Sequence, residues 1–527
     1  MNETVAQVIV KALYHWGIKN IYGVSGDAIL PFMDALGRQN NIKFYSTAGE
    51  QGASFMACGE ARITGRPGVC LSTEGPGALN LINGVTDAYH DGVPMLVITG
   101  QVKTGKIDTN AKQYFNQQQL FAPVTGFTTL LTRPESVIET LKITLEKAIG
   151  DNTPCHVSIP KDILLSPIHH YQIPPLNIPC PPALSSNVDK VINLMFTSRK
   201  PLIIAGKAAI PVKEKVYHLA RHMGAAVIPG QGARGIFSGI DDFIVGGLGE
   251  AHIPPILHQA DCILLVGASP YEHKFIPNTK VIQIDTRPQN LAHRLNPLSV
   301  TGDMALALDL IMEGLKKYKC SASWREEVKR HHQEFIEMIN AEAGLPDKPI
   351  SPRKVVSMLN EIIPEDAIIT IDSGEFMHWF DRGFVPQKNT VIISEYWRCM
   401  GSGLPFGLGA QVAHSEKKVI ILAGEGGFIM TMQEILTAAR YVLPVVIIVF
   451  NNGRYLLEEH NMQKAGMVPF GINVHAPDFS AFAGACGVKG FKVEDPQKLR
   501  GILNQAMSHN SPVLVDVLIK DEKPAFI

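Results

Sequence analysis

The sequence lacks paired cysteines, long apolar runs and an excess of either charge, and each absence excludes a class of protein. Its eight cysteines are spread singly, which argues against the usual zinc spacings and a disulfide framework. No apolar run approaches the roughly 20 residues needed to cross a bilayer. The 48 Lys and Arg residues nearly balance the 49 Asp and Glu residues, so no overall field attracts nucleic acid or a membrane. We therefore expect a small-molecule partner.

The remaining composition is that of a soluble globular protein. Hydrophobic residues make up 46% and charged residues 18% of the 527 residues, which is enough apolar material for about three cores. The first residues, MNETVAQVIVKALYHWG, carry an acid where a signal peptide would be basic, and their apolar positions recur at helical spacing. These features predict a cytoplasmic location.

Short apolar runs alternate with longer segments of helical periodicity. Runs without polar alternation are typical of parallel strands that are buried on both faces. The pattern therefore predicts an α/β protein with doubly wound parallel sheets. The runs span 68–73, 94–100, 155–160, 201–206, 261–267, 280–285, 367–372, 390–394, 418–424, 445–451 and 512–517.

Two breaks divide the chain. Residues 166–187 contain six prolines, which fix the backbone and remove donors, so this stretch is predicted to be an extended connector. Residues 316–352 contain the charged segment WREEVKRHHQEFIEMINAE, which predicts a surface helix within a second connector. The predicted domains are then 1–165, 188–315 and 350–527.

A candidate metal site follows two neighbouring apolar runs of the third domain. Glu425 ends one run and Asn452 follows the next, 452 − 425 = 27 residues later, a separation that fits a loop, a helix and a return strand. Because the carboxyl ends of adjacent parallel strands share one edge of a sheet, the two side-chain oxygens are expected to converge. With the backbone carbonyl of Arg454 they would form half of an oxygen octahedron suited to Mg²⁺.

Three glycines surround Glu425 in the stretch GEGGFIMTMQE. Gly424, Gly426 and Gly427 remove side chains where a diphosphate would approach the backbone, and a helix predicted from about Phe428 would point its N-terminal amides at the anion. The stretch matches neither the GxGxxG nor the GxxxxGK[ST] pattern. Glycines also end strands in α/β proteins of every kind, so this spacing alone leaves a structural explanation open.

Several stretches, taken in order, resemble the thiamine-diphosphate-dependent enzymes, most closely catabolic acetolactate synthases and pyruvate oxidases. The resemblance spans nearly the whole chain and implies a fold of three doubly wound domains that holds thiamine diphosphate and Mg²⁺. The similar stretches include IYGVSGDAILPFMDAL, AGEQGASFMACGEA, VGASPYE, ITIDSGEF, CMGSGLPFGLGAQVA and GEGG with its distant Asn452.

The resemblance implies a catalytic role for Glu50. From the residues alone, Glu50 is an acid at a helix N-terminus, which the helix dipole explains. In the family, a glutamate at this point shares a proton with the aminopyrimidine ring of the coenzyme, and this proton exchange generates the nucleophilic carbon of the coenzyme.

Other coenzyme contacts are implied in the same way. Met400 is by itself a typical core methionine, but it matches the residue that holds the coenzyme bent, while the backbone at Arg398 and Met400 would hold the pyrimidine. Gly374 resembles a diphosphate contact and Tyr455 a further coenzyme contact. Asp372 is predicted to orient the turn before Gly374.

The sequence departs from the family pattern at three places. Glu425 replaces the usual Asp, which affects the choice of metal because Mg²⁺ demands near-ideal geometry. Glu74 stands where the family has a small residue, so it lies near the coenzyme or faces solvent. The segment KQYFNQQQLFAPVTGF is about three residues shorter than in acetolactate synthases, so the substrate-side glutamine corresponds to Asn116, to Gln117 or to neither.

The expected activity is decarboxylation of a 2-oxo acid, with pyruvate as the expected donor, and joining of the product to a second 2-oxo acid. Two alternatives stay open: a flavin-dependent pyruvate oxidase, with FAD in the central domain, and a binding protein that has lost turnover. Because Glu50 and the metal site belong to different domains, the resemblance implies a homodimer or homotetramer with active sites at the subunit interface. No membrane or nucleic-acid partner is expected.

Overall fold

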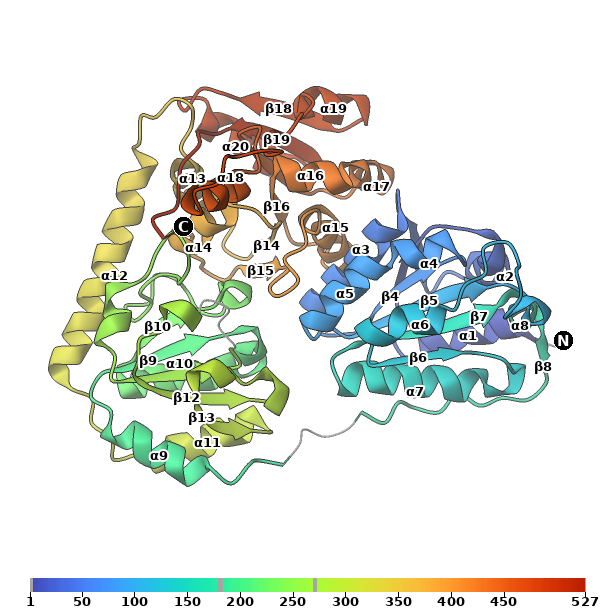
Figure 1. Ribbon diagram of the computed structural model, residues 1–527, viewed down its shortest axis with the longest axis horizontal. Helices are drawn as coiled ribbons and strands as arrows, with labels where there is room; N and C mark the ends of the chain where they lie inside the picture. The colour runs from blue at the N-terminus through green and yellow to red at the C-terminus, as the bar shows by residue number, and fades with distance from the viewer. Residues whose placement is uncertain (1–2, 179–182, 269–272, 527) are drawn as a thin grey trace.

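The computed structural model describes residues 3–178, 183–268 and 273–526. It contains three parallel sheets with helices on both faces, arranged around a common junction (Figure 1). The fold class is therefore the one that the apolar runs and the resemblance predict. Each sheet lies within one of the three predicted ranges, while the boundaries themselves stay predictions.

The N-terminal domain is built on a six-stranded parallel sheet of order β3-β2-β4-β5-β7-β6. A two-stranded ribbon pairs β1 with β8, which starts the connector to the central domain. The strands are β1 (Glu3–Thr4), β2 (Asn20–Gly23), β3 (Lys43–Ser46), β4 (Gly68–Ser72), β5 (Met95–Gln101), β6 (Phe127–Leu130), β7 (Pro154–Pro160) and β8 (Pro167–Ile168). The helices are α1 (Val5–His15), α2 (Leu30–Gly37), α3 (Glu50–Thr64), α4 (Pro76–Asn80), α5 (Ile82–His90), α6 (Gln117–Phe121), α7 (Val137–Gly150) and α8 (Lys161–Leu165).

The central domain has a five-stranded parallel sheet of order β10-β9-β11-β12-β13. Its strands are β9 (Pro201–Ala205), β10 (Ala226–Pro229), β11 (Cys262–Val266), β12 (Lys280–Asp285) and β13 (Leu298–Thr301). The helices are α9 (Val188–Thr197), α10 (Lys213–Met223) and α11 (Met304–Gly314), with 3₁₀ turns η5 (Lys207–Val212) and η6 (Gln231–Ala233) after the first two strands.

The C-terminal domain has a six-stranded parallel sheet of order β15-β14-β16-β17-β19-β18. Its strands are β14 (Ile368–Ile371), β15 (Thr390–Ile393), β16 (Val419–Gly424), β17 (Val446–Asn451), β18 (Lys489–Val493) and β19 (Val513–Leu518). Its helices are α13 (Pro352–Ile362), α14 (Phe376–Gly383), α15 (Gly403–Ala413), α16 (Glu425–Thr431), α17 (Ile435–Arg440), α18 (Leu456–Lys464), α19 (Phe479–Ala485) and α20 (Leu499–Ser508), with the 3₁₀ turn η11 (Met432–Glu434).

The N-terminal and C-terminal domains share one apolar core, although no repeat is visible in the sequence. Helix α3 of the first packs on α15 of the second, where glycines let the backbones touch. A Cβ atom on Gly59 would lie 2.4 Å from the carbonyl oxygen of Phe406, and one on Gly409 would lie 2.0 Å from that of Met56. The rings of Phe55 and Phe406 meet edge to face at 5.4 Å. The two domains are therefore one packed unit within the chain.

The predicted charged helix is α12 (Ala322–Ala343), which runs along the central and C-terminal domains (Figure 1). It is not only a surface helix, because a stripe from Trp324 to Ile339 is buried. Trp324 donates to the carbonyl of Pro201 in the central domain, and the hydroxyl of Ser357 in the C-terminal domain donates to the carbonyl of Ile339. The helix thus ties the two domains together.

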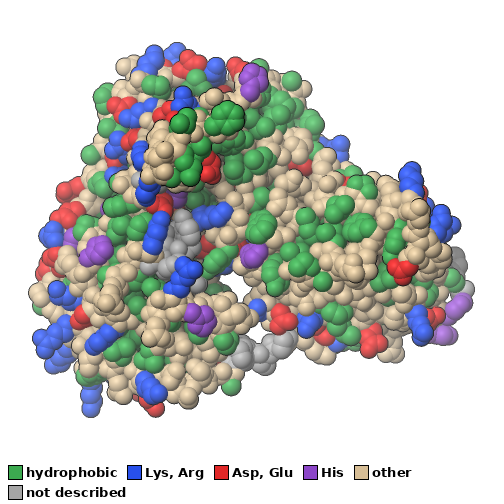
Figure 2. All heavy atoms as spheres, in the orientation of Figure 1, with side chains coloured by type: hydrophobic (Ala, Val, Ile, Leu, Met, Phe, Trp, Pro, Cys, Tyr) green, Lys and Arg blue, Asp and Glu red, His purple; other side chains and the backbone are tan. Residues whose placement is uncertain are grey.

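The surface agrees with the balanced charge of the sequence. Lys, Arg, Asp and Glu are interspersed on the face shown in Figure 2, and hydrophobic side chains gather on the C-terminal domain. The described helices include none with the length and apolar character of a membrane span. The seven described cysteines are all free.

Candidate functional site

The candidate site lies at the carboxyl edge of the C-terminal sheet. Strand β14 pairs with β15 on one side and β16 on the other, and β16 pairs with β17. The chain order therefore reverses between β14 and β16, and ligands of open α/β sheets bind in the crevice at such a switch point. Three candidate residues directly follow adjacent strands of this sheet: Asp372 follows β14, Glu425 follows β16 and Asn452 follows β17.

The structure brings the side chains of Glu425 and Asn452 together. The backbone N–H of Arg454 donates to Oε1 of Glu425 at 2.7 Å and lies 3.3 Å from Oδ1 of Asn452. Two oxygens from neighbouring strand ends thus converge on one donor. Helix α16 begins at Glu425 rather than near Phe428, so the predicted helix start is corrected by three residues, and the carboxylate sits in the first turn.

Glu425 is almost completely enclosed, with 3% of its surface exposed. Burial raises the pKa of Glu425 to about 7, although backbone N–H groups of its own turn and of Arg454 act in the opposite direction. Among the described residues, no group of three or more His, Cys, Asp and Glu side chains is placed to hold a metal ion. A cation here would therefore depend on one carboxylate, an amide oxygen, a backbone carbonyl and oxygens of the ligand, a set that fits Mg²⁺.

The glycines next to Glu425 have internal packing partners. A Cβ atom on Gly426 would lie 2.4 Å from Cε1 of Tyr455 and 3.3 Å from Cε of Met400. One on Gly427 would lie 2.6 Å from Oδ2 of Asp372. The structure therefore gathers Met400, Tyr455 and Asp372 around the glycines, and close packing alone requires glycine at both positions.

Gly374 and Gly424 both pack against the ring of Phe376. Cβ atoms on these residues would lie 3.2 and 3.3 Å from the ring of Phe376. Asp372, just before Gly374, accepts the backbone N–H groups of Ser373 and Gly401, both at 2.8 Å. It orients the turn as predicted, and burial raises its pKa to about 7.

Arg398 occupies the left-handed backbone region, with φ of 55°. Its guanidinium donates to the side-chain oxygen of Gln231 in the central domain and to the sulfur of Met377 at 2.9 Å. Only the backbone of Arg398 therefore remains to face a ligand beside Met400, as the resemblance implies.

Glu50 lies at the carboxyl edge of the N-terminal sheet as the first residue of α3. Its carboxylate accepts the amide of Asn80 at 3.1 Å. The loop just before it is held from the C-terminal domain, because Glu434 accepts the backbone N–H groups of Ala48 at 3.2 Å and Gly49 at 3.0 Å. Glu434 closes the stretch GEGGFIMTMQE, yet sequence reasoning gave it no role.

The two candidate substrate residues differ in placement. Asn116 is exposed and caps α6 by accepting the N–H of Gln119 at 3.0 Å. Gln117 is fully buried, where it accepts from Thr99 and donates to the carbonyl of Gly100 at 2.8 Å. As placed here, only Asn116 has a side chain that is free to meet a ligand without leaving a core position.

Two further acids lie near the strand ends. Glu74 is 7% exposed and accepts from its neighbour Thr73, so the expectation that it faces solvent is wrong. Glu375, next to Gly374, lies 2.8 Å from Nδ1 of His460. Burial raises the pKa of Glu375 to about 9, which keeps it protonated and able to donate beside Gly374. No sequence signal beyond its adjacency to Gly374 pointed to this pair.

The described part of the central domain offers no cradle for a dinucleotide at its switch point, between β9 and β11. A Cβ atom on Gly206 would lie 2.2 Å from the carbonyl oxygen of Gly267, and one on Gly267 would lie 2.5 Å from the backbone nitrogen of Ala209. The two loops therefore pack on each other. The glycine stretch 230–235 follows an edge strand and opens only the short turn η6. Gly235 packs on the carbonyl of Asn389. Close packing within the chain is therefore enough to explain the glycines of these loops.

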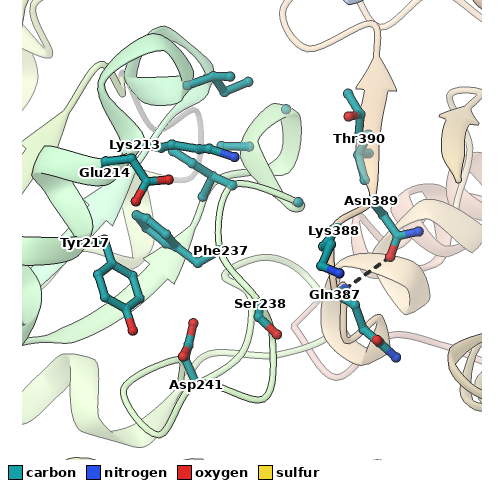
Figure 3. Close-up of a pocket in the computed structure, with 16 residues that line it drawn as sticks. Lys213, Glu214, Tyr217, Phe237, Ser238, Asp241, Gln387, Lys388, Asn389 and Thr390 are labelled. Atoms are coloured by element: carbon teal, nitrogen blue, oxygen red, sulfur yellow. Dashed lines mark hydrogen bonds between the residues drawn. The ribbon is translucent and has the colours of Figure 1, made fainter. Parts of the chain in front are cut away.

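A cavity of about 440 Å³ lies between the central and C-terminal domains (Figure 3). Lys213, Tyr217 and Asp241 line one side, and Gln387 and Asn389 line the other. This second group lies just before β15, at the opposite end of the sheet from Glu425. None of the site residues predicted from the sequence lines it.

Comparison with known proteins assigns all three domains. Residues 3–120 match the N-terminal TPP binding domain of thiamine pyrophosphate enzymes, residues 188–311 match their central domain, and residues 372–517 match their C-terminal TPP binding domain. These matches cover most of the chain and agree with the three sheets.

Relatives extend the likeness along the full length. The chain is 31% identical to a probable acetolactate synthase large subunit of Methanocaldococcus jannaschii, over 98% of this chain and 91% of that protein. It is 29% identical to the putative thiamine pyrophosphate-containing protein YdaP of Bacillus subtilis, over 99% and 93%. It is 27% identical to a pyruvate oxidase of Lactiplantibacillus plantarum, over 99% and 90%.

Proposed function

The chain belongs to the family of thiamine pyrophosphate enzymes, and from this membership we propose that it decarboxylates a 2-oxo acid and joins the product to a second 2-oxo acid. Pyruvate is the proposed donor. The observation that carries the proposal is the convergence of Glu425 and Asn452 on the N–H of Arg454 at the switch point. Thiamine diphosphate, when bound, would supply a nucleophilic carbon and an electron-accepting ring for the electron pair that stays on the substrate when CO₂ leaves.

The residues of the C-terminal edge hold the coenzyme in this proposal. Glu425, Asn452 and the carbonyl of Arg454 bind Mg²⁺, which neutralises the diphosphate. Gly374, Gly424, Gly426 and Gly427 line the diphosphate side, where the protonated Glu375 adds a donor instead of a negative charge. Met400 and Tyr455 pack beside Gly426 and support the rings.

Glu50 is the proposed acid–base residue. It holds a proton on the aminopyrimidine ring, and the Glu434 contacts fix the loop that presents it. We propose a homodimer or homotetramer in which each site combines Glu50 of one subunit with the C-terminal edge of another. Support comes from a loop after α18 whose Met467, Val468 and Phe470 are 60%, 84% and 87% exposed, because exposed apolar patches often mark protein interfaces.

The oxidase named among the relatives is the second candidate. It requires a flavin, and the packing of Gly206 and Gly267 in the central domain argues against one. Absorbance near 450 nm of the purified protein distinguishes the two activities. A flavin band that persists on gel filtration would favour the oxidase.

The direct assay uses purified protein with pyruvate, thiamine diphosphate and Mg²⁺. The proposal predicts release of CO₂ together with an acetohydroxy acid, measured as acetoin after acid treatment. CO₂ without acetoin would indicate simple decarboxylation, and no CO₂ from a panel of 2-oxo acids would favour a binding protein that has lost turnover.

A further inference from the structure

The segment 395–400 connects β15 to α15 and ends at Met400, beside Gly426. It contains the left-handed residue Arg398, so its backbone path is not one that the local sequence prefers. Something outside the segment must hold it, and its contacts come from both of the other domains.

The N-terminal domain holds the segment by its backbone. Asp91, at the end of α5, accepts the N–H groups of Glu395 at 2.9 Å and Tyr396 at 3.0 Å. The indole of Trp397 donates to Asn83 at 2.9 Å and stacks on His90, with ring centroids 5.0 Å apart. Three consecutive residues are thus fastened to one helix.

The central domain reaches the same point through Lys207, the first residue after Gly206. Its Nζ lies 3.4 Å from Oδ1 of Asp91 and 3.3 Å from Oε2 of Glu395, and 5.8 Å from the ring centroid of Tyr396. The N–H of Gly232, from the glycine stretch after β10, also donates to Glu395 at 3.3 Å. The two loops that would carry a nucleotide in a dinucleotide-binding domain are therefore used for contacts with the segment.

The charges at this junction require Lys207. Asp91 is 4% exposed, and Arg62 pairs with it at 2.7 Å as well as with the buried Asp87. Burial alone would raise the pKa of Asp91, but Lys207 and Arg62 outweigh it and hold the pKa well below its usual range. Without Lys207, Asp91 and Glu395 would lose the ammonium group that lies within 3.4 Å of both carboxylates, where Asp91 is poorly solvated.

We propose that Lys207 and Asp91 form a clamp between the three domains that positions segment 395–400, and so Met400, for the coenzyme. The central domain then contributes to the coenzyme site through this contact. The inference rests on the proposed function for the ligand that Met400 meets. Lys207 and Asp91 are positioning residues, because neither touches that ligand.

The test compares Lys207→Met with wild type and with Lys190→Met, a matched control at an exposed lysine of the same domain. In the full-length protein without coenzyme, we expect amide hydrogen exchange of Glu395 and Tyr396 to rise about tenfold in Lys207→Met only. Coenzyme affinity with Mg²⁺, measured by calorimetry, should weaken by about tenfold, since the loosened segment must be ordered on binding. Lys207→Arg should restore most of the protection from amide exchange and most of the coenzyme affinity.

The amide-exchange measurement tests the clamp, and coenzyme binding by the wild type tests the proposed function separately. If exchange and affinity in Lys207→Met stay within about twofold of wild type, the clamp is refuted. If wild type takes up no thiamine diphosphate, the proposed function fails, while the exchange data still decide whether the clamp exists. Should Lys207→Met not fold, the milder Lys207→Gln gives the same decision at Glu395 and Tyr396, where unchanged exchange would overturn the proposal.

Discussion

The six-stranded sheets of the N-terminal and C-terminal domains have the same strand order. When the six strands of each sheet are counted along the chain, from β2 and from β14, the first strand lies between the second and the third, and the sixth lies between the fourth and the fifth. In both, a glutamate follows the third strand, Glu74 after β4 and Glu425 after β16. In both, an amide stands at the end of the fourth strand, Gln101 as the last residue of β5 and Asn452 directly after β17. The two carboxyl edges nevertheless differ in what their side chains contact.

In the N-terminal domain these groups bind to their own loops. Thr73 donates to Glu74, and the amide oxygen of Gln101 accepts the N–H of Val102 at 2.9 Å. In the C-terminal domain, Glu425 and Asn452 converge on Arg454 instead. The shared topology thus supplies the edge, while a few residues decide whether the edge gathers oxygens for a cation or presents a single acid, Glu50.

The largest expected effect separates the two glutamates. Glu425→Gln should weaken Mg²⁺-assisted binding of thiamine diphosphate by roughly 10³-fold, because it removes the one charged ligand that the protein supplies to a buried cation in this proposal. Glu74→Gln should change it by less than about threefold, since Glu74 is bound to Thr73. Titration calorimetry with and without Mg²⁺ measures both. Equal losses in the two variants would remove the distinction between the edges.

The second effect separates binding from turnover. Glu50→Gln should lower turnover by at least about 10², the usual contribution of a general acid–base residue, and leave coenzyme affinity within about tenfold. The measurement is kcat with saturating coenzyme, together with calorimetry. Unchanged turnover would exclude Glu50 from the chemistry and leave the N-terminal edge with a purely structural role.

The third effect is the pH dependence of the C-terminal edge. Burial raises the pKa of Glu425 from 4.5 to about 7, and the carboxyl must lose its proton to bind a cation. Coenzyme affinity with Mg²⁺ should therefore rise about tenfold per pH unit up to about pH 7 and level off above it. In Glu425→Gln this slope should vanish, and a slope that persists would assign the titration to another group.

The same shift affects the protein without coenzyme. Because the unfolded carboxyl ionises near pH 4.5 and the folded one near pH 7, the Glu425 contribution favours the folded state at low pH and declines as pH rises between these values. Urea unfolding midpoints of wild type should therefore fall relative to those of Glu425→Gln as pH rises from 5.5 to 7. Parallel midpoints would contradict the raised pKa.

The smallest expected effect concerns the contact between the two domains. Glu434→Ala leaves the N–H of Gly49 without its partner and the N–H of Ala48 with only the hydroxyl of Thr437, which should cost about 2 kcal/mol in the free energy of unfolding. Turnover should fall by less than in Glu50→Gln, because Glu434 only holds the loop. The exposed Glu337→Ala serves as the control for urea unfolding. Equal free energies of unfolding in the two variants would show that the contacts of Glu434 do not stabilise the protein.

The sequence predicts the sheet centres better than their edges. All eleven apolar runs form strands, because a strand covered on both faces needs a continuous apolar run. Five of the six missed strands in the three sheets lie at sheet edges: β3, β6, β10, β13 and β18. Polar residues such as Lys43, Thr128 and Lys489 interrupt the apolar pattern in three of them, since one side of an edge strand meets solvent or a loop.

The same distinction holds within the site. The approach of Glu425 and Asn452 was predictable, because neighbouring parallel strands bring their carboxyl ends together whatever the details of the loops. The contacts of Asp91, Lys207 and Glu395 were not, because these residues come from three domains whose packing no local pattern specifies. Gln117 is a further example, since only the tertiary structure shows that its amide is used by Thr99 and Gly100.

The central claim is that the C-terminal edge holds a divalent cation between Glu425 and Asn452. Crystals grown with thiamine diphosphate and Mn²⁺, a scatterer that replaces Mg²⁺, test it directly through anomalous diffraction. We expect a peak within about 2.0–2.3 Å of a carboxylate oxygen of Glu425 and of the amide oxygen of Asn452. A peak elsewhere, or coenzyme density with no metal at these two side chains, would contradict it.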